Sequence, residues 1–271
     1  MSNTGAAATI DREWKRYSAG ERLMRFVVYV AIVAAVVLSI RTVEVIPDFI
    51  LDAPEQVVDL LKRMWPPDVA SYPKEIHAAL LDSLHIATVG TVLGVTMALP
   101  FGFLAARNVT PWPWLNWLAR LVLISTRSVN TLVFALFFVA VFGPGALAGT
   151  LAIAFHSIGF VGRLFSEALE NTSPGPIEAL RAAGAPGASV ISFGYWPQVV
   201  PAFWSLVLFR WDINVRESIV LGLVGAGGVG MALDNALNLF QWTRVAMILL
   251  AILGVVVAAE VAVTYIRKKI I

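Results

Sequence analysis

Six long apolar stretches limit how this chain can fold more than any other feature of its sequence. Each is close to the roughly 20 residues that a helix needs to cross the hydrocarbon core of a bilayer, which is about 30 Å thick. The stretches cover residues 24–40, 83–106, 118–142, 146–162, 197–221 and 245–266. They predict an all-α polytopic membrane protein with six transmembrane helices.

The charge content agrees with a membrane protein. Only 14% of the residues are charged, 58% are apolar, and the mean hydropathy is +0.78. A soluble domain has about 25% charged residues, so this chain could not cover a water-facing surface. The net charge of +2 does not suggest nucleic acid, and we expect no such partner. There is no cysteine, and the three histidines lack metal-site spacing, so we expect no metal site.

The distribution of Lys and Arg predicts the orientation in the membrane. With the N-terminus inside, the cytoplasmic segments hold 13 of these residues, the outer segments hold five, and two lie in the fifth apolar stretch. We therefore expect both termini to be cytoplasmic. We also expect residues 1–25 to form a cytoplasmic segment, without a signal peptide, and residues 26–271 to form a single transmembrane domain.

The outward loop over residues 41–82 is predicted to contain a helix. Pro54 suits its first turn and Pro66 stops it. One helical stripe is apolar and consists of Val57, Val58, Leu61, Met64 and Trp65. The pattern fits either a helix lying at the membrane interface or a short buried helix within the loop.

The stretch "LGLVGAGGVG", residues 221–230, contains the pattern G-x-G-x-x-G. A dinucleotide site also needs a preceding strand and an acidic residue about 20 positions later. The residues at that distance are Leu249 and Leu250, and the chain has no P-loop sequence, so we expect no nucleotide or other cofactor here. Glycine also permits tightly turned backbone at a membrane boundary. We expect such a turn on the outer side, formed by Gly225, Gly227, Gly228 and Gly230.

The cytoplasmic loop over residues 166–196 is predicted to form a helix, a turn and a second helix. Pro176 suits a first helical position, and Glu178 lies in the first turn, where the helix dipole favours an acid. Gly184 ends this helix, and a second short helix runs to Pro197. The first helix has a face of small residues that suits the docking of another protein, namely Ala179, Ala182 and Ala183.

This loop resembles the EAA loop of ABC importer permeases. The family pattern is E-A-A, three residues, G, nine residues, and I-x-L-P; here "EALRAAG" is followed after nine residues by "GYWP". The matching positions are Glu178, Ala179, Gly184 and Pro197. The departures are Leu180, Gly194 and Trp196. The resemblance implies that the helix, including Arg181, Ala182 and Ala183, inserts into a cleft of a separate ATPase subunit.

Nearly the whole chain resembles the phosphonate-importer permease group. The most specific stretch is "RWDINVRESIVLGLVGAGGVG", residues 210–230, and others are "SLHIATVGTVLG" and "ALPFGFLAARN". The chain departs at Thr131, where the group usually has an acidic residue. The resemblance implies a type I ABC importer permease fold and a homodimer in a bacterial inner membrane. It also implies two ATPase subunits that hold ATP and Mg²⁺, and a periplasmic or lipid-anchored binding protein that delivers a phosphonate or related oxyanion. The chain itself would not be an enzyme.

The fifth apolar stretch carries polar residues that are costly in a membrane. At 100° per residue, Arg210, Asn214 and Glu217 share one helical stripe. Asp212 and Arg216 lie on another in i, i+4 register, which predicts an internal ion pair. Arg210 and Glu217 are candidates for a second pair. The functional alternative is that this stretch lines the translocation path, with the candidate residues Arg210, Asp212, Asn214, Arg216 and Glu217. Arg210 or Arg216 would then contact the substrate, since guanidinium matches oxyanions. We expect His156, in the middle of the fourth stretch, to hydrogen-bond across the bundle or dimer.

Small residues at four-residue spacing predict close helix packing. Gly90 and Gly94 form such a pair in the second stretch, and Gly254 and Ala258 form a weaker one in the sixth.

Two other functions remain open from the sequence. One is an ABC importer permease for another small anion. The other is an ion-driven carrier that uses Asp212, Glu217 and Glu260 as a relay, although this function leaves the loop over residues 166–196 without a role. A membrane enzyme is disfavoured because no nucleophile lies beside a base.

Overall fold

The computed structural model describes residues 17–42 and 47–270, and every regular element within these ranges is helical. The all-α prediction is therefore confirmed for this part of the chain. The predicted cytoplasmic segment 1–25 lies mostly outside the described residues. The chain divides into two compact units, residues 1–58 and 59–271, and each is described by itself. The prediction of one transmembrane domain over residues 26–271 stays a prediction.

The first unit holds helix α1, Ala19–Thr42, and most of helix α2, Pro47–Met64. α1 has charged residues only near its two ends, has no buried residue, and at 24 residues is long enough to cross a membrane. The predicted loop helix is present as α2, but the prediction that Pro54 lies in its first turn is wrong. Apolar residues at helical spacing, beginning with Phe49, precede Pro54, so the helix starts earlier and contains the proline.

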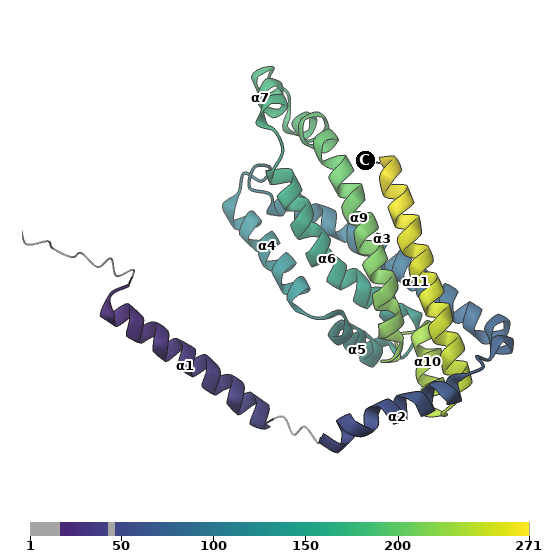
Figure 1. The fold of residues 1–271 in the computed structure, drawn as a ribbon. Coiled ribbons are helices and arrows are strands. Elements are labelled where there is room, and N and C mark those ends of the chain that lie inside the picture. The colour runs from purple at the N-terminus through teal and green to yellow at the C-terminus, as the bar shows by residue number, and fades with distance from the viewer. Residues whose placement is uncertain (1–16, 43–46, 271) are drawn as a thin grey trace, which may run out of the picture. The chain divides into compact units, whose positions relative to one another are not determined.

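The second unit is a bundle of helices around α3, α6 and α9 (Figure 1). Its longer helices are α3 His77–Ala105, α4 Pro113–Ser128, α5 Thr131–Phe142, α6 Ala146–Glu170, α7 Pro174–Ala182, α9 Trp196–Gly222, α10 Val229–Asn238 and α11 Trp242–Ile270. Short 3₁₀, α and π turns are η1 Val69–Ser71, η2 Tyr72–Ile76, α8 Gly187–Ser189 and η3 Val190–Tyr195. α3 packs most extensively against α6, and α9 lies against both.

Within the described ranges, four helical segments are long and apolar enough to cross a membrane. They are Ala19–Thr42, Val69–Ala105, Ala146–Glu170 and Trp242–Lys269. α9 has 27 residues, enough for a crossing, but it carries four charged side chains. The total of six spans therefore stays a prediction that depends on α9 and on the segment formed by α4 and α5.

The prediction of one continuous span over residues 118–142 is wrong. α4 and α5 meet at an angle of 87°. α4 has 16 residues, which is about 24 Å at 1.5 Å per residue and shorter than the bilayer core. The break is local: Val129 is extended, and the side chain of Asn130 accepts a hydrogen bond from the Leu132 N–H at 2.9 Å. An N-cap residue thus starts a new helix inside an apolar run.

The close packing predicted at Gly90 and Gly94 is confirmed. A Cβ on Gly90 would lie 2.8 Å from Ile153 Cγ2, and one on Gly94 would lie 2.6 Å from Ser157 Cβ. α3 and α6 can approach this closely only because these positions lack side chains. The weaker pair is different, since nothing among the described residues lies within 4 Å of a Cβ on Gly254.

We expect Gly94→Ala to lower the thermal unfolding temperature of the chain in detergent. Its new methyl group would lie 2.6 Å from Ser157 Cβ and 2.8 Å from the Ala154 carbonyl oxygen, and such overpacking costs about 1–3 kcal/mol. Gly254→Ala is the matched control, because it adds the same methyl group at a helix position where no described atom lies within 4 Å. It should be neutral or slightly stabilising. Equal unfolding temperatures for the two variants would contradict the packing of α3 on α6.

Candidate coupling loop and membrane charge network

The predicted coupling surface lies at one end of the second unit. Figure 1 shows α7 and the C-terminal end of α11 at this end, and α10 at the opposite end. α7 is anchored by Ile177, which is buried. The predicted coupling residues are exposed, namely Glu178, Ala179, Arg181, Ala182, Ala183, Gly184 and Pro197. The structure thus presents this set to a partner, while its role in coupling stays a prediction.

Gly184 ends α7, as predicted. Its φ is +75°, a conformation that favours glycine. Its N–H donates to the Arg181 carbonyl, and the Ala185 N–H donates to the Leu180 carbonyl, each at 3.0 Å. These bonds satisfy carbonyls at the helix end.

Two details of the predicted loop are wrong. The first helix begins at Pro174, two residues before Pro176. The second is not a separate short helix that stops at Pro197. α8, the π turn η3 and α9 follow one another without a gap from Gly187 to Gly222. Pro197 therefore lies inside this continuous stretch, directly after the π turn η3, and does not end a helix.

The departures from the EAA pattern pack against one another or into the core. A Cβ on Gly194 would lie 3.3 Å from both Ile177 Cγ1 and Leu180 Cδ1. The larger side chain at 180 is therefore accommodated by the absence of a side chain at 194. The ring of Trp196 contacts that of Phe203 at a centroid distance of 5.7 Å. The three departures therefore alter the packing beneath the loop, while the matching residues of the EAA pattern remain on its exposed surface.

A buried arginine connects α6 and α9 inside the bundle. Arg210 is 2% exposed. Its Nε donates to Ser157 Oγ at 3.0 Å, and its Nη2 pairs with Glu217 Oε2 at 3.2 Å. The same carboxylate oxygen accepts the Thr131 hydroxyl at 2.9 Å. The ion pair suggested by the helical stripe is present, and it supplies the partner that a buried charge needs.

Asn214 extends this network to α3. Its Nδ2 donates to Thr91 Oγ1 at 2.7 Å and to Ser157 Oγ at 3.2 Å, and the residue is fully buried. Ser157 therefore accepts from both Arg210 and Asn214. These polar contacts hold α3, α6 and α9 together where the surrounding packing is apolar.

The second predicted pair is also present, in a different environment. Arg216 Nη2 lies 2.7 Å from Asp212 Oδ2 and 3.8 Å from Glu260 Oε2. The Arg216 side chain is 50% exposed, whereas Arg210 is buried. Both arginines thus have the ion-pair partners predicted from the sequence, and they differ in burial, since Arg210 is buried and Arg216 is half exposed.

A cavity of about 300 Å³ lies at the break between α4 and α5. Its lining residues are Asn130, Thr131, Leu132, His156, Arg216, Glu217, Val220 and Leu221. His156 Nδ1 lies 3.0 Å from the Val129 carbonyl oxygen, so this histidine bonds across the bundle as expected. Sequence reasoning did not identify Asn130 or His156 as site residues. The sequence feature that could have revealed this break was Asn130, a residue suited to a helix start that lies within an apolar stretch.

The predicted glycine turn is present between α9 and α10. Gly225, Gly227 and Gly228 have φ of +84°, +88° and +75°. The turn packs on the starts of α3 and α6, because the Val229 N–H donates to Ser83 Oγ at 2.8 Å and the Gly145 N–H donates to the Gly225 carbonyl at 2.9 Å.

Gly230 is required for a different reason. Its φ is ordinary, but a Cβ there would lie 2.7 Å from the Cα of Gly222. The prediction that these glycines adjoin the translocation route on the outer side stays a prediction.

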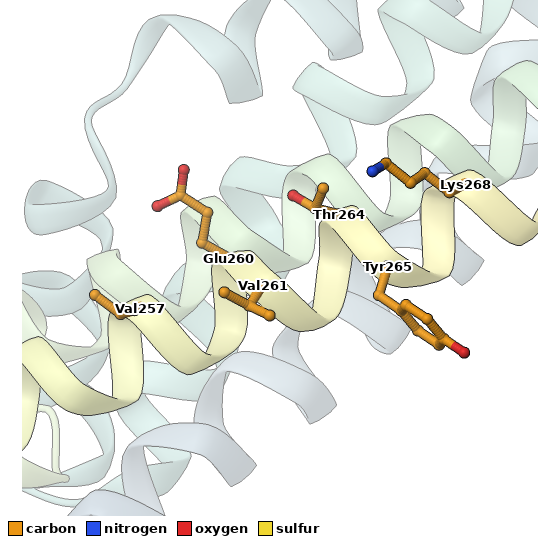
Figure 2. Close-up of a pocket in the computed structure, with 6 residues that line it drawn as sticks. All are labelled: Val257, Glu260, Val261, Thr264, Tyr265 and Lys268. Carbon is orange, nitrogen blue, oxygen red and sulfur yellow. The ribbon is translucent and has the colours of Figure 1, made fainter.

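One face of α11 carries polar side chains. Figure 2 shows Glu260, Thr264 and Lys268 projecting from the same side of this helix, beside a pocket of about 460 Å³. The Glu260 side chain is 66% exposed. A carboxylate facing lipid is costly, so this face needs a cover other than hydrocarbon.

Comparison with known proteins identifies the family of this chain and several similar proteins. Residues 98–271 match the family model described as the inner membrane component of binding-protein-dependent transport systems. The chain is 40% identical over 219 residues to the phosphite transport system permease protein PtxC of Stutzerimonas stutzeri, covering 81% of this chain and 79% of that one. It is 38% identical over 234 residues to the phosphate-import permease protein PhnE of Mycolicibacterium smegmatis. That match covers 86% of this chain, which spans only 44% of that relative.

Solved ABC transporters share the fold. A chain of the inward-facing MetNI methionine ABC transporter matches with a TM-score of 0.64 and 21% identity, over 72% of this chain and 96% of that chain. A chain of an amino acid ABC transporter matches with a TM-score of 0.63 and 17% identity, over 74% and 96%. These similarities confirm the expected type I ABC importer permease fold. With the family match over residues 98–271, they show that the chain belongs to the binding-protein-dependent transport system inner membrane components.

Proposed function

We propose that the chain is the membrane-spanning permease subunit of an ATP-driven importer for phosphonates or related phosphorus oxyanions. The observation that carries this proposal is the 40% identity to a phosphite transport permease over about four fifths of both chains. The family transports substrates and does not catalyse a reaction. Its dependence on a binding protein disfavours the ion-driven carrier, which would need no such partner.

The proposed assembly contains two copies of this chain, two ATPase subunits and a binding protein outside the membrane. ATP and Mg²⁺ belong to the ATPase subunits. The exposed residues of α7, from Glu178 to Gly184, offer a surface for an ATPase subunit. The polar face of α11 around Glu260 offers a surface that a second copy can cover. We place the protein in a bacterial inner membrane with both termini cytoplasmic. The cytoplasmic C-terminus is supported by α7 and the basic C-terminal end lying at the same end of the second unit, and the cytoplasmic N-terminus by the distribution of Lys and Arg.

The proposed coupling follows from how the loop is connected. α6 continues to Glu170, so the predicted start of the loop at residue 166 is wrong, and the continuous helix from Gly187 to Gly222 follows α7. These two helices are linked deep in the bundle by the hydrogen bond from Arg210 Nε to Ser157 Oγ. ATP-driven closure of the ATPase subunits would push on α7, and the linked helices would carry that motion to the cavity at the α4–α5 break. Access to the path would then alternate between the two sides of the membrane.

We expect uptake to require the ATPase. Cells without their own phosphonate and phosphite transport, carrying this chain with its binding protein and ATPase, should grow on methylphosphonate or phosphite as the phosphorus source and accumulate the labelled compound. Omitting the ATPase should abolish accumulation. Accumulation at an undiminished rate without the ATPase would instead support the ion-driven carrier.

Two glycines of the coupling loop provide a matched test. Gly184 and Gly175 are both exposed, and a Cβ at either position would meet no atom of the described residues within 4 Å, but Gly184 alone of the two has positive φ. Alanine costs roughly 1–2 kcal/mol in that conformation. We expect Gly184→Ala to reduce copurification of the ATPase about 5- to 30-fold, since fewer loops have the binding conformation. Gly175→Ala should leave copurification unchanged. If the two variants copurify the ATPase equally, the backbone conformation at Gly184 is not needed for ATPase binding.

The burial of Arg210 changes what a substitution there should do. From the sequence we expect Arg210→Ala and Arg216→Ala to reduce uptake without loss of assembly. In the structure, Arg210→Ala removes a buried side chain and leaves Glu217, which is 28% exposed, without its ion-pair partner. Breaking a fully buried pair costs about 3–5 kcal/mol, and the partial exposure of Glu217 reduces this cost. We therefore expect Arg210→Ala to lower the unfolding temperature in detergent strongly, and Arg216→Ala to lower it little.

A double variant tests whether the loss of stability comes from the unpaired charge. Arg210→Met with Glu217→Gln removes both charges and should restore much of the unfolding temperature. An unfolding temperature of Arg210→Ala equal to that of the unsubstituted chain would contradict the structural role of the pair.

A further inference from the structure

The cavity at the α4–α5 break combines a cation with hydrogen-bond acceptors. The cation is Arg216, which lines the cavity and is half exposed. Among the described residues, its contacts with Asp212 and Glu260 both run through Nη2. The guanidinium has five N–H donors, so Nε and Nη1 can donate to a ligand. Arg210 differs, because Ser157 and Glu217 fix it within the protein.

The first acceptor is His156. Its Nδ1 contacts the Val129 carbonyl oxygen at 3.0 Å. A carbonyl oxygen only accepts hydrogen bonds, so Nδ1 must carry the proton in this contact. In the neutral imidazole, Nε2 is then the nitrogen with a lone pair, and it accepts a hydrogen bond. His156 lines the cavity, so its free acceptor nitrogen belongs to a residue of the same polar site.

The second acceptor is Glu217. Both hydrogen bonds that described residues donate to its carboxylate, from Thr131 and Arg210, end on Oε2. Oε1 can therefore accept another hydrogen bond. Glu217 also lines the cavity, so the site presents two acceptors beside one forked donor.

We propose that this cavity is a transit site for a tetrahedral oxyanion that still carries an acidic proton. Arg216 binds the ionised oxygens, and the single hydroxyl hydrogen is donated either to His156 Nε2 or to Glu217 Oε1. The proposal deepens the proposed function on which it rests, since monoanionic phosphonate and phosphite carry both kinds of oxygen. Sulfate has no hydroxyl, so it would place lone pairs against two acceptors, and unpaired polar groups of this kind reject a ligand.

The surrounding charges keep such a site weak. Asp212 and Glu260 share the positive charge of Arg216. Weak binding suits a site that a solute must enter and leave, because conduction needs binding that is favourable but readily reversed.

The test uses the full chain purified in detergent, without the binding protein. Methylphosphonate at millimolar concentration is observed by ³¹P NMR, in which binding broadens its line. We expect broadening that excess phosphite reverses and that the same concentration of sulfate does not. Arg216→Gln should weaken binding at least tenfold. Arg163→Gln is the matched control, since Arg163 pairs with Glu167 on α6 and does not line the cavity.

Two variants of His156 test the acceptor. His156→Asn can still donate to the Val129 carbonyl but has no atom at the position of Nε2, whereas His156→Gln places an acceptor near that position. We expect Asn to weaken methylphosphonate binding about tenfold and Gln to retain most of it. Unfolding temperatures of all variants are measured alongside.

The site is wrong if the unsubstituted chain causes no broadening, if sulfate displaces methylphosphonate as well as phosphite does, or if the Arg216 and His156 variants bind normally. The proposed function fails separately, if cells carrying the complete importer take up neither phosphonate nor phosphite.

Discussion

The rest of this membrane bundle depends on the burial of one guanidinium group. Arg210 lies among apolar helices and is tolerated because Glu217 neutralises it and Ser157 accepts its Nε–H. The polar partners come from α6 and α9, so satisfying the charge also fixes how these helices pack. In a bilayer the hydrophobic effect does little to hold helices together. Hydrogen bonds and close packing, such as that at Gly94, carry more of the specificity than in a soluble protein.

The contact between Arg210 and Ser157 also connects the coupling loop with the cavity in the proposed mechanism. The coupling loop is bracketed by α6 and the continuous helix that includes α9, and these helices are linked at Ser157 and Arg210. One turn beyond Asp212 along α9, Arg216 faces the cavity at the α4–α5 break. In the proposed mechanism, a motion at α7 is transmitted through the buried Arg210, while the half-exposed Arg216 is available to the anion.

Much of the fold and part of the site could be predicted from the sequence. Helical periodicity placed Arg210 and Glu217 on one stripe, and i, i+4 spacing identified the pair of Asp212 and Arg216. The resemblance to the EAA loop located α7 and its glycine end. The sequence did not reveal the cavity. Its lining comes from α5, α6 and α9, and it exists because Asn130 starts a new helix where the apolar pattern continues without interruption.

The sequence by itself determined that the chain is a helical membrane protein, because the length of its apolar stretches and its few charges are local properties. Its motifs determined the family, and its clustered glycines the position of the turns. Tertiary structure alone decided which arginine is locked and which is accessible. Arg210 and Arg216 lie six residues apart on different stripes of one helix, and only the packed bundle shows that α6 supplies Ser157 to Arg210. It also decided that Leu180 and Gly194 compensate each other, since volume complementarity appears only when two helices meet.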